Sequence, residues 1–313
     1  MRAAQVTALG EPATAADVVP PEGDDVLEVV AAPLNPIDIA ASRGILAAGH
    51  PPLPYVPGCE TVARRADGTL VWVFGGGLGV ARDGGMAEQV ALGTANAIAV
   101  PEGADAALAG AMGIAGLAGW LPFAWRAPLA GGEDVLVLGA TGAVGLVAVQ
   151  AARLLGAGRV VAAGRSRSGL DRALELGADD VVDLGATDDL VGAFKAAFGG
   201  VGPSYVFDPL WGAPAAAAIE AAVPWTRLVN LGQSAGPLSE LASAAVRFKS
   251  ISILGHTNFA ASTEELAEHY DRLVRHAIAG EVVLEIERIP LDDVADAWRR
   301  QAASPGHKLV VVP

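Results

Sequence analysis

The chain has 313 residues, enough for about two domains at the usual size of roughly 100–200 residues each. Hydrophobic residues make up 52% of it, so a sizeable core can form, and 35 acidic residues against 21 basic ones give a net charge of −14. That charge argues against binding to nucleic acids or anionic membranes, because both need a basic surface. The single cysteine, Cys59, excludes an internal disulfide and a four-thiolate zinc site.

The N-terminal stretch "MRAAQVTALGEP" is not typical of a signal peptide, because its apolar run is short and interrupted. Two uncharged runs, 106–125 and 135–152, reach the length of a membrane span. The first is mostly Ala and Gly around Pro122, and the second contains a glycine turn, so we expect neither to cross a membrane. We therefore expect a cytoplasmic protein that acts on a small molecule, without nucleic-acid or membrane partners.

Prolines and glycines crowd the first hundred residues, as in "APLNPID", "HPPLPYVPG" and "FGGGLG". The apolar runs between them are short and lack helical periodicity. This pattern predicts an irregular, mostly antiparallel β domain.

From Asp134 onward, short β-branched runs alternate with Ala/Leu-rich segments of helical length such as 145–157. Alternation of this kind predicts βαβ units and a parallel sheet. The runs are apolar throughout, as expected where helices cover both faces of a sheet. Six such runs complete one doubly wound Rossmann domain: 134–139, 159–164, 179–184, 204–210, 227–232 and 251–256.

After residue 256 the pattern changes again. Ser262, with Glu265 three places on, predicts a capping box at the start of a long helix. A strand at 281–289, a second helix at 291–303 and a final strand follow. These pieces lack a core of their own, so we expect them to pack on the N-terminal β domain. The predicted domains are therefore 1–115 together with 257–313, and 116–256.

The stretch "VLVLGATGAVG" (135–145) places Gly139, Gly142 and Gly145 at a strand-to-helix junction. A helix N-terminus offers free N–H groups and a partial positive charge to an anion. Glycine at 142 lets a pyrophosphate approach the backbone, and glycine at 145 allows close packing of helix on strand. The stretch therefore predicts a dinucleotide site at Thr141, Gly142, Ala143 and Val144.

The residue that reads the adenosine ribose is expected about twenty positions further on, at the end of the second strand. There the chain reads Gly164, Arg165, Ser166, Arg167, with no acid to bind a ribose hydroxyl. Planar guanidinium groups bind phosphate oxygens in pairs, so this segment predicts the 2′-phosphate of NADPH. The alternative is that both arginines only solvate a loop.

Two layouts of dinucleotide enzyme can be compared with this order of domains. Short-chain dehydrogenases use a Tyr-x-x-x-Lys pair, but none of Tyr55, Tyr205 and Tyr270 has a lysine four places on. A β domain, then a Rossmann domain, then a return to the first domain resembles the medium-chain dehydrogenase/reductase superfamily. Its local support comes from "PLNPIDIAASRG" (33–44), "PYVPGCE" (54–60), "GGMAEQV" (84–90), "GATGAVGLVAVQAARLLGA" (139–157), "LGADDVVD" (176–183), "VFDPLWG" (206–212) and "GHKLVVVP" (306–313).

The Asn-Pro-x-Asp stretch is similar to the zinc-free quinone oxidoreductase branch of that superfamily. The resemblance implies an α/β fold, with a Rossmann doubly wound parallel sheet and a GroES-like irregular β domain. It implies an NADPH-dependent oxidoreductase that delivers hydride to a quinone or an α,β-unsaturated carbonyl compound. It also implies a homodimer, which fits the apolar sixth strand, "SISILGH", at a sheet edge.

The sequence also offers candidate polar groups for the substrate cleft. Asn35, Asp38 and Tyr55 are the candidate catalytic groups, and the alternatives are a turn or cap residue for Asp38 and a structural role for Tyr55. Two positions depart from the branch, Ala40 and Ala118, and leave the proton donor unassigned. A non-catalytic NADPH-binding regulatory protein of the same fold therefore remains an alternative. On the resemblance, the residues expected to reach the cofactor from later segments are Asn230, Leu231, Gly232, Asn258 and Lys308. The alternative for Lys308 is a simple surface charge.

No catalytic metal is predicted. A catalytic zinc needs three protein ligands. Cys59 stands where the zinc branch has a histidine, and the five histidines show no ligand spacing. A metal shared by Cys59 and Glu60 is the alternative.

Overall fold

The computed structural model describes residues 1–46 and 49–313. It contains two compact units. The first comprises Met1–Ala115, Ser262–Gly280 and Leu284–Pro313, and the second comprises Gly116–Ala261 and Glu281–Val283. The second unit thus extends past residue 256, to the end of the 3-10 turn η3 (Asn258–Ala260) and the residue after it.

Six strands form the sheet of the second unit: β8 (Asp134–Leu138), β9 (Arg159–Gly164), β10 (Asp180–Asp183), β11 (Tyr205–Asp208), β12 (Arg227–Asn230) and β13 (Ser252–Gly255). Their order is β10-β9-β8-β11-β12-β13 and every neighbouring pair is parallel, which confirms the predicted Rossmann sheet. The order reverses between β8 and β11. A doubly wound sheet binds its ligand beyond the carboxyl ends of the strands at such a reversal.

Helices bury the apolar faces of these strands. Leu136 and Val206 in the sheet share one hydrophobic cluster with Phe194 and Ala218 from two of the helices, and all four are fully buried. This packing explains why the strand sequences are apolar without alternation. The helices of the unit are α3 (Leu117–Leu121), α4 (Ala143–Leu154), α5 (Arg167–Glu175), α6 (Leu190–Ala197), α7 (Gly212–Ala221) and α8 (Ser243–Phe248), with a π-helical turn η2 (Pro122–Arg126) after α3.

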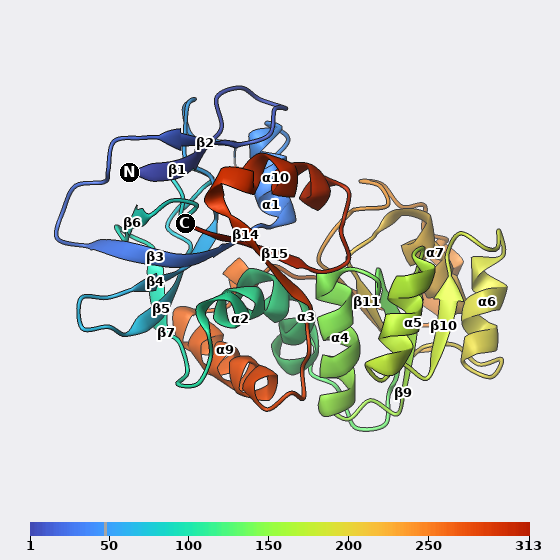
Figure 1. Cartoon of the computed structure of the whole chain (residues 1–313). Coiled ribbons are helices and arrows are strands. Elements are labelled where there is room, and N and C mark those ends of the chain that lie inside the picture. The colour runs from blue at the N-terminus through green and yellow to red at the C-terminus, as the bar shows by residue number, and fades with distance from the viewer. Residues whose placement is uncertain (47–48) are drawn as a thin grey trace. The chain divides into compact units, whose positions relative to one another are not determined.

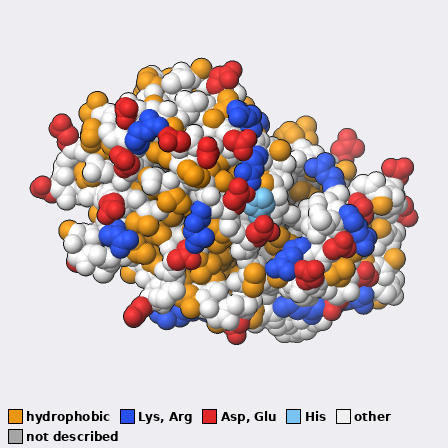
Figure 2. Space-filling model, viewed as in Figure 1, with side chains coloured by type: hydrophobic (Ala, Val, Ile, Leu, Met, Phe, Trp, Pro, Cys, Tyr) orange, Lys and Arg blue, Asp and Glu red, His pale blue; other side chains and the backbone are white. Residues whose placement is uncertain are grey.

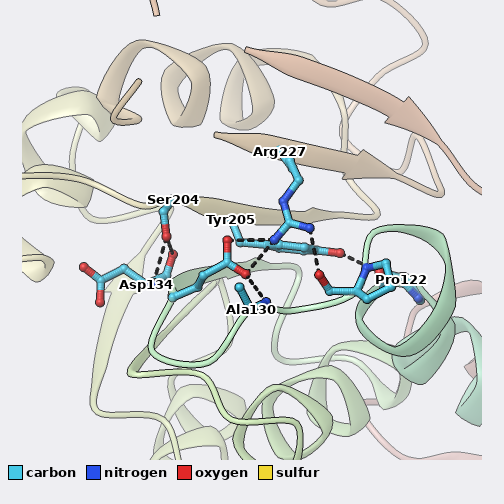
Figure 3. A network of polar contacts seen from close by, with 8 residues as sticks. Pro122, Ala130, Asp134, Ser204, Tyr205 and Arg227 are labelled. Atoms are coloured by element: carbon cyan, nitrogen blue, oxygen red, sulfur yellow. Dashed lines mark hydrogen bonds and ion pairs between the residues drawn. The ribbon is translucent and has the colours of Figure 1, made fainter. Parts of the chain in front are cut away.

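A polar network fixes the amino ends of β8, β11 and β12 (Figure 3). Arg227 Nη2 donates to both carboxylate oxygens of Glu133, at 2.7 and 2.5 Å, and Nη1 donates to the carbonyl of Pro128 at 2.8 Å. The Tyr205 hydroxyl donates to the Pro122 carbonyl at 2.6 Å. The Arg227 guanidinium lies 5.0 Å from the centroid of the Tyr205 ring. These bonds tie the segment before β8 to the sheet, at the edge opposite the expected ligand crevice.

The first unit has a seven-stranded sheet and a two-stranded one. The larger sheet runs β14-β15-β3-β4-β5-β7, with β6 paired to β3, and only β14 and β15 are parallel. This is the irregular, mostly antiparallel β architecture that the sequence predicts. The strands are β1 (Arg2–Gln5), β2 (Thr14–Asp17), β3 (Val26–Pro33), β4 (Glu60–Arg64), β5 (Leu70–Phe74), β6 (Gln89–Ala91), β7 (Asn96–Ala99), β14 (Ile286–Pro290) and β15 (Lys308–Val312).

The C-terminal segments complete this unit. β15 pairs with β3, so the last strand joins the N-terminal sheet as predicted. The predicted strand at 281–289 begins only at Ile286, because Val283 instead exchanges two hydrogen bonds with the Gln150 side chain, at 2.7 and 2.9 Å. The helices of the unit are α1 (Pro36–Ser42), α2 (Ala106–Ala111), α9 (Thr263–Ile278) and α10 (Val294–Ala302).

The predicted capping box is present at the start of α9. The Ser262 hydroxyl accepts from the Glu265 N–H at 3.2 Å, and the Glu265 carboxylate accepts from the Ser262 N–H at 2.7 Å. α9 lies beside α2 (Figure 1), where the Tyr270 hydroxyl donates to the Ala109 carbonyl at 2.9 Å.

The apolar run Ala106–Arg126 forms consecutive helical turns that are long and apolar enough to cross a membrane. Within the protein, however, 78% of its most apolar window is buried. Burial of this kind is also what a core helix shows. On the face in Figure 2, basic and acidic side chains are interspersed, and the basic ones form no continuous stripe there.

Candidate functional site

In the glycine turn between β8 and α4, the space beside Gly142 is open, whereas the space beside Gly145 is occupied by backbone atoms. A Cβ at Gly142 would meet only the Gly139 carbonyl oxygen, at 3.9 Å, whereas a Cβ at Gly145 would lie 2.2 Å from that oxygen. Gly142 is the N-cap of α4, with no side-chain cap and no acidic residue in the first turn. The predicted residues Thr141, Gly142, Ala143 and Val144 therefore surround a helix N-terminus that fits a phosphate.

Thr141 joins this turn to the end of β9. A Cβ at Gly164 would lie 2.3 Å from Thr141 Cγ2, and one at Gly169 would lie 2.6 Å from Thr141 Cβ. Only glycine at both positions leaves room for the threonine side chain. The turn and the segment 164–167, predicted separately, thus lie together.

The polar groups of that segment differ in what they already bind. The Ser166 hydroxyl caps α5 by accepting from the Gly169 N–H at 3.2 Å, and the Arg167 guanidinium lies 3.1 Å from Asp171. Arg165 is exposed and has no ion pair within the described part of the chain. Arg165 is therefore the group best placed to bind an incoming anion.

The carboxyl ends of β11 and β12 are joined by a buried acid that sequence analysis missed. Asp208 accepts from the N–H groups of Leu210 and Trp211, at 2.9 and 2.8 Å, and from Asn230 Nδ2 at 2.9 Å. Burial raises the pKa of its carboxyl. Asn230 Nδ2 also donates to the Gly232 carbonyl at 2.8 Å. The predicted residues Asn230, Leu231 and Gly232 thus lie at the expected edge, but the amide nitrogen of Asn230 holds the two loops together.

Two polar side chains follow β13 at the same edge. The backbone N–H of His256 donates to the Asn230 carbonyl at 2.8 Å. Nε2 of the His256 ring lies 3.2 Å from Asn258 Oδ1. The resemblance predicts Asn258 as a cofactor residue. It does not predict His256, because no motif in the sequence distinguishes that residue.

A buried polar cluster in the first unit comprises Asn35, Asp38, Cys59, Glu60 and Lys308, all 3% exposed or less. Lys308 Nζ donates to Asn35 Oδ1 at 2.6 Å and to the Leu34 carbonyl at 3.0 Å. Asn35 Nδ2 in turn donates to Glu60 Oε1 at 2.8 Å. Lys308, predicted to reach the cofactor, therefore donates to acceptors of its own unit.

The two carboxylates of the cluster are also engaged. Glu60 Oε2 accepts from Trp72 Nε1 at 2.7 Å and from the Ile114 N–H at 2.8 Å. Asp38 accepts from the N–H groups of Asn35 and Cys59, at 2.8 and 2.9 Å, and so caps α1. Asp38 thus stabilises the start of a helix, which is a structural role.

Burial dominates the ionisation of the cluster. It raises the pKa values of Asp38, Cys59 and Glu60 and lowers the pKa of Lys308. The opposite charges of Lys308 and the two acids partly counter these shifts. A single ammonium group therefore compensates two buried carboxyl groups.

Tyr55 differs from the other two candidate catalytic residues. It is 1% exposed, and its hydroxyl has no hydrogen-bond partner among the residues that the structure describes. Burial, reinforced by the charge of Asp38, raises the pKa of Tyr55 to about 12. The hydroxyl is therefore a neutral, uncommitted donor at pH 7.

The donor set around Cys59 and Glu60 does not fit a zinc ion. Over residues 1–46 and 49–313, no group of three or more His, Cys, Asp or Glu side chains is arranged to hold a metal. Both oxygens of Glu60 already accept hydrogen bonds from Asn35, Trp72 and Ile114.

Comparisons with known proteins agree with this fold. Residues 143–275 match a family described as zinc-binding dehydrogenase. Quinone oxidoreductase-like protein 2 of Mus musculus is 29% identical over 280 residues, which cover 85% of this chain and 79% of that protein. The quinone oxidoreductase of Thermus thermophilus, solved also as a complex with NADPH, superposes with a TM-score of 0.80 at 25% identity over all of both chains. An NAD-dependent alcohol dehydrogenase superposes with a TM-score of 0.85 at 26% identity, also over all of both chains.

The cluster generates a prediction about stability. Lys308→Met removes the donor to Asn35 and Leu34 and leaves two buried acids without a counter-charge. We expect it to lower the free energy of unfolding by about 3–5 kcal/mol, measured by urea denaturation. The control is Arg288→Met, which breaks an exposed pair with Asp105 at 2.8 Å and should cost less than about 1 kcal/mol. Equal losses in the two variants would contradict the role of Lys308.

Proposed function

We propose that this chain is a zinc-independent, NADPH-dependent reductase of the medium-chain dehydrogenase/reductase superfamily, in its quinone oxidoreductase-like branch. Its substrate is a quinone or an α,β-unsaturated carbonyl compound. The observation that carries this proposal is the open glycine turn at Gly142, joined through Thr141 to the segment that presents Arg165. The quinone oxidoreductases among the similar proteins, one of them solved with NADPH, support it.

Different residues of the chain would bind different parts of the cofactor. The N–H groups at the start of α4 would hold the pyrophosphate, and Arg165 would bind the 2′-phosphate. When bound, NADPH supplies the hydride, while the protein supplies orientation and electrostatics.

We infer the substrate class from the protein groups that are available to stabilise the oxygen of the substrate. Glu60 already accepts hydrogen bonds from three donors, so it is not available as a ligand to a metal ion. A metal ion is the group that usually polarises the oxygen of a ketone. Among the described residues the buried Tyr55 hydroxyl is an uncommitted donor, and it would stabilise negative charge on a substrate oxygen. Hydride addition to a quinone or enone gives a delocalised anion that can take its proton from water. A simple ketone would give a localised alkoxide and should not react.

Cofactor preference tests the first part of the proposal. Arg165→Ala should weaken NADPH binding about tenfold and leave NADH binding unchanged, because only NADPH carries the 2′-phosphate. Tryptophan fluorescence titration measures both. The matched control is Arg172→Ala, an α5 arginine already paired with Glu175 at 2.6 Å, which should change neither affinity. Equal wild-type affinities for NADPH and NADH would contradict the assignment.

Turnover tests the second part. Tyr55→Phe should lower kcat for a small quinone about tenfold, less than the 10²–10⁴ expected of an essential acid, and EDTA should leave the wild-type rate unchanged. The rate of NADPH oxidation measures both the effect of Tyr55→Phe and the effect of EDTA. NADPH binding without any turnover would instead support the alternative, a non-catalytic NADPH-binding protein. Loss of activity with EDTA would point to a metal.

We also propose that two copies pair through β13. This strand bonds only to β12, so its other edge is unpaired within the described chain, and Ile253 on it is 38% exposed. Trp225 and Phe248, 77% and 79% exposed, lie near its amino end. Pairing of such edges by a two-fold axis removes an aggregation hazard. Light scattering at about 10 μM should give a dimer mass, and Ile253→Lys should shift it toward the monomer. A monomeric wild type would refute this pairing.

A further inference from the structure

His256 lies on the half of the sheet opposite to Arg165. A doubly wound sheet consists of two mononucleotide-binding halves, and a dinucleotide lies across the reversal between them. Arg165 follows β9, in the β8-β9-β10 half, whereas His256 directly follows β13, in the β11-β12-β13 half. With the adenosine side at Arg165, the other nucleoside of the dinucleotide belongs on the side of His256.

The contacts of the imidazole fix which nitrogen is free. Nε2 lies 3.2 Å from Asn258 Oδ1, which can only accept, so Nε2 carries the proton and Nδ1 carries a lone pair. Nδ1 is buried and has no hydrogen-bond partner among the residues described. The ring is held edge-on to Trp125, with centroids 6.1 Å apart.

The surroundings keep Nδ1 unprotonated. Burial, with a smaller contribution from the charge of Arg126, lowers the pKa of His256 to about 4. Arg126 is fixed nearby, because its Nε donates to the Gly255 carbonyl at 2.9 Å. The imidazole is therefore neutral at pH 7 and can accept a hydrogen bond at Nδ1. A buried acceptor without a donor is unfavourable, and a ligand that brings a donor relieves that cost.

We propose that His256 Nδ1 accepts a hydrogen bond from the nicotinamide nucleoside of the bound dinucleotide. The donor is either the carboxamide N–H or a ribose hydroxyl, the two kinds of donor that this nucleoside carries. The inference rests on the proposed dinucleotide binding and assigns a cofactor-positioning role to a side chain that no sequence motif marks.

Binding of three ligands to three proteins tests the proposal, without any turnover. The proteins are the wild type, His256→Phe and His256→Asn, since asparagine can keep an acceptor near the position of Nδ1. The ligands are NADP⁺, its 3-acetylpyridine analogue, which lacks the carboxamide N–H, and adenosine 2′,5′-bisphosphate, which lacks the nicotinamide nucleoside. Isothermal titration calorimetry gives each Kd.

We expect His256→Phe to weaken NADP⁺ binding about three- to tenfold and to leave the bisphosphate unchanged, while His256→Asn binds both nearly as the wild type does. If the wild type also disfavours the acetylpyridine analogue by a similar factor, and His256→Phe does not, the donor is the carboxamide. If the wild type binds analogue and NADP⁺ equally, the donor is the ribose hydroxyl.

Equal binding of NADP⁺ by the wild type and His256→Phe would overturn the inference, as would a parallel loss of bisphosphate binding. Should His256→Phe fail to fold, ¹⁵N NMR of the wild type decides: the Nδ1 resonance should move upfield with NADP⁺ and stay in place with the bisphosphate. An unmoved resonance in the presence of bound NADP⁺ would overturn the inference. Failure of the proposed function has a different signature, because the wild type would then bind neither NADP⁺ nor the bisphosphate.

Discussion

The first unit depends on the hydrogen bond from Lys308 Nζ to Asn35 Oδ1, 2.6 Å long and buried. It connects the last strand of the chain to Asn35, the N-cap residue of α1. Through Asn35 Nδ2 the connection continues to Glu60 at the start of β4, and from Glu60 to Trp72 in β5. One buried ammonium thus compensates acids from two other segments. Buried charges of this kind are tolerated only when each has a partner, so the segments must assemble together.

This arrangement separates polar residues whose atoms are bonded within the fold from a polar residue that is left without a partner. Asn35, Asp38 and Lys308 look like a reactive set in the sequence, yet each has its polar atoms bonded within the first unit. Tyr55 has the same burial and a hydroxyl without a described partner. An uncommitted donor can respond to charge on a substrate, whereas a committed one would first have to break a native hydrogen bond.

The second unit follows the same division at the carboxyl edge of its sheet. Asp208 and Asn230 bond to each other and to the loop backbones, and so set the shape of that edge. The N–H groups after Gly142, the guanidinium of Arg165 and the Nδ1 of His256 are the groups to which we assign the proposed dinucleotide contacts. Of these groups, His256 is held by that pair, because its backbone N–H donates to the Asn230 carbonyl at 2.8 Å, and precise ligand sites require such support.

The sequence by itself determined the fold class, the six parallel strands, the glycine turn and the helix capped by Ser262. These features depend on local spacing: apolar runs, turn glycines and capping residues act over a few positions along the chain. The sequence could not show that Lys308 bonds to Asn35, that Asp208 holds Asn230, or that His256 is left with a free lone pair. Lys308 and Asn35 are 273 residues apart in the chain, and Asp208 and Asn230 are 22 apart. The lone pair of His256 stays free because no other described segment supplies a donor to it. Only the tertiary structure decides which polar groups are hydrogen-bonded within the fold and which are left without a partner. The reason is that a buried polar atom needs a partner that is close in space.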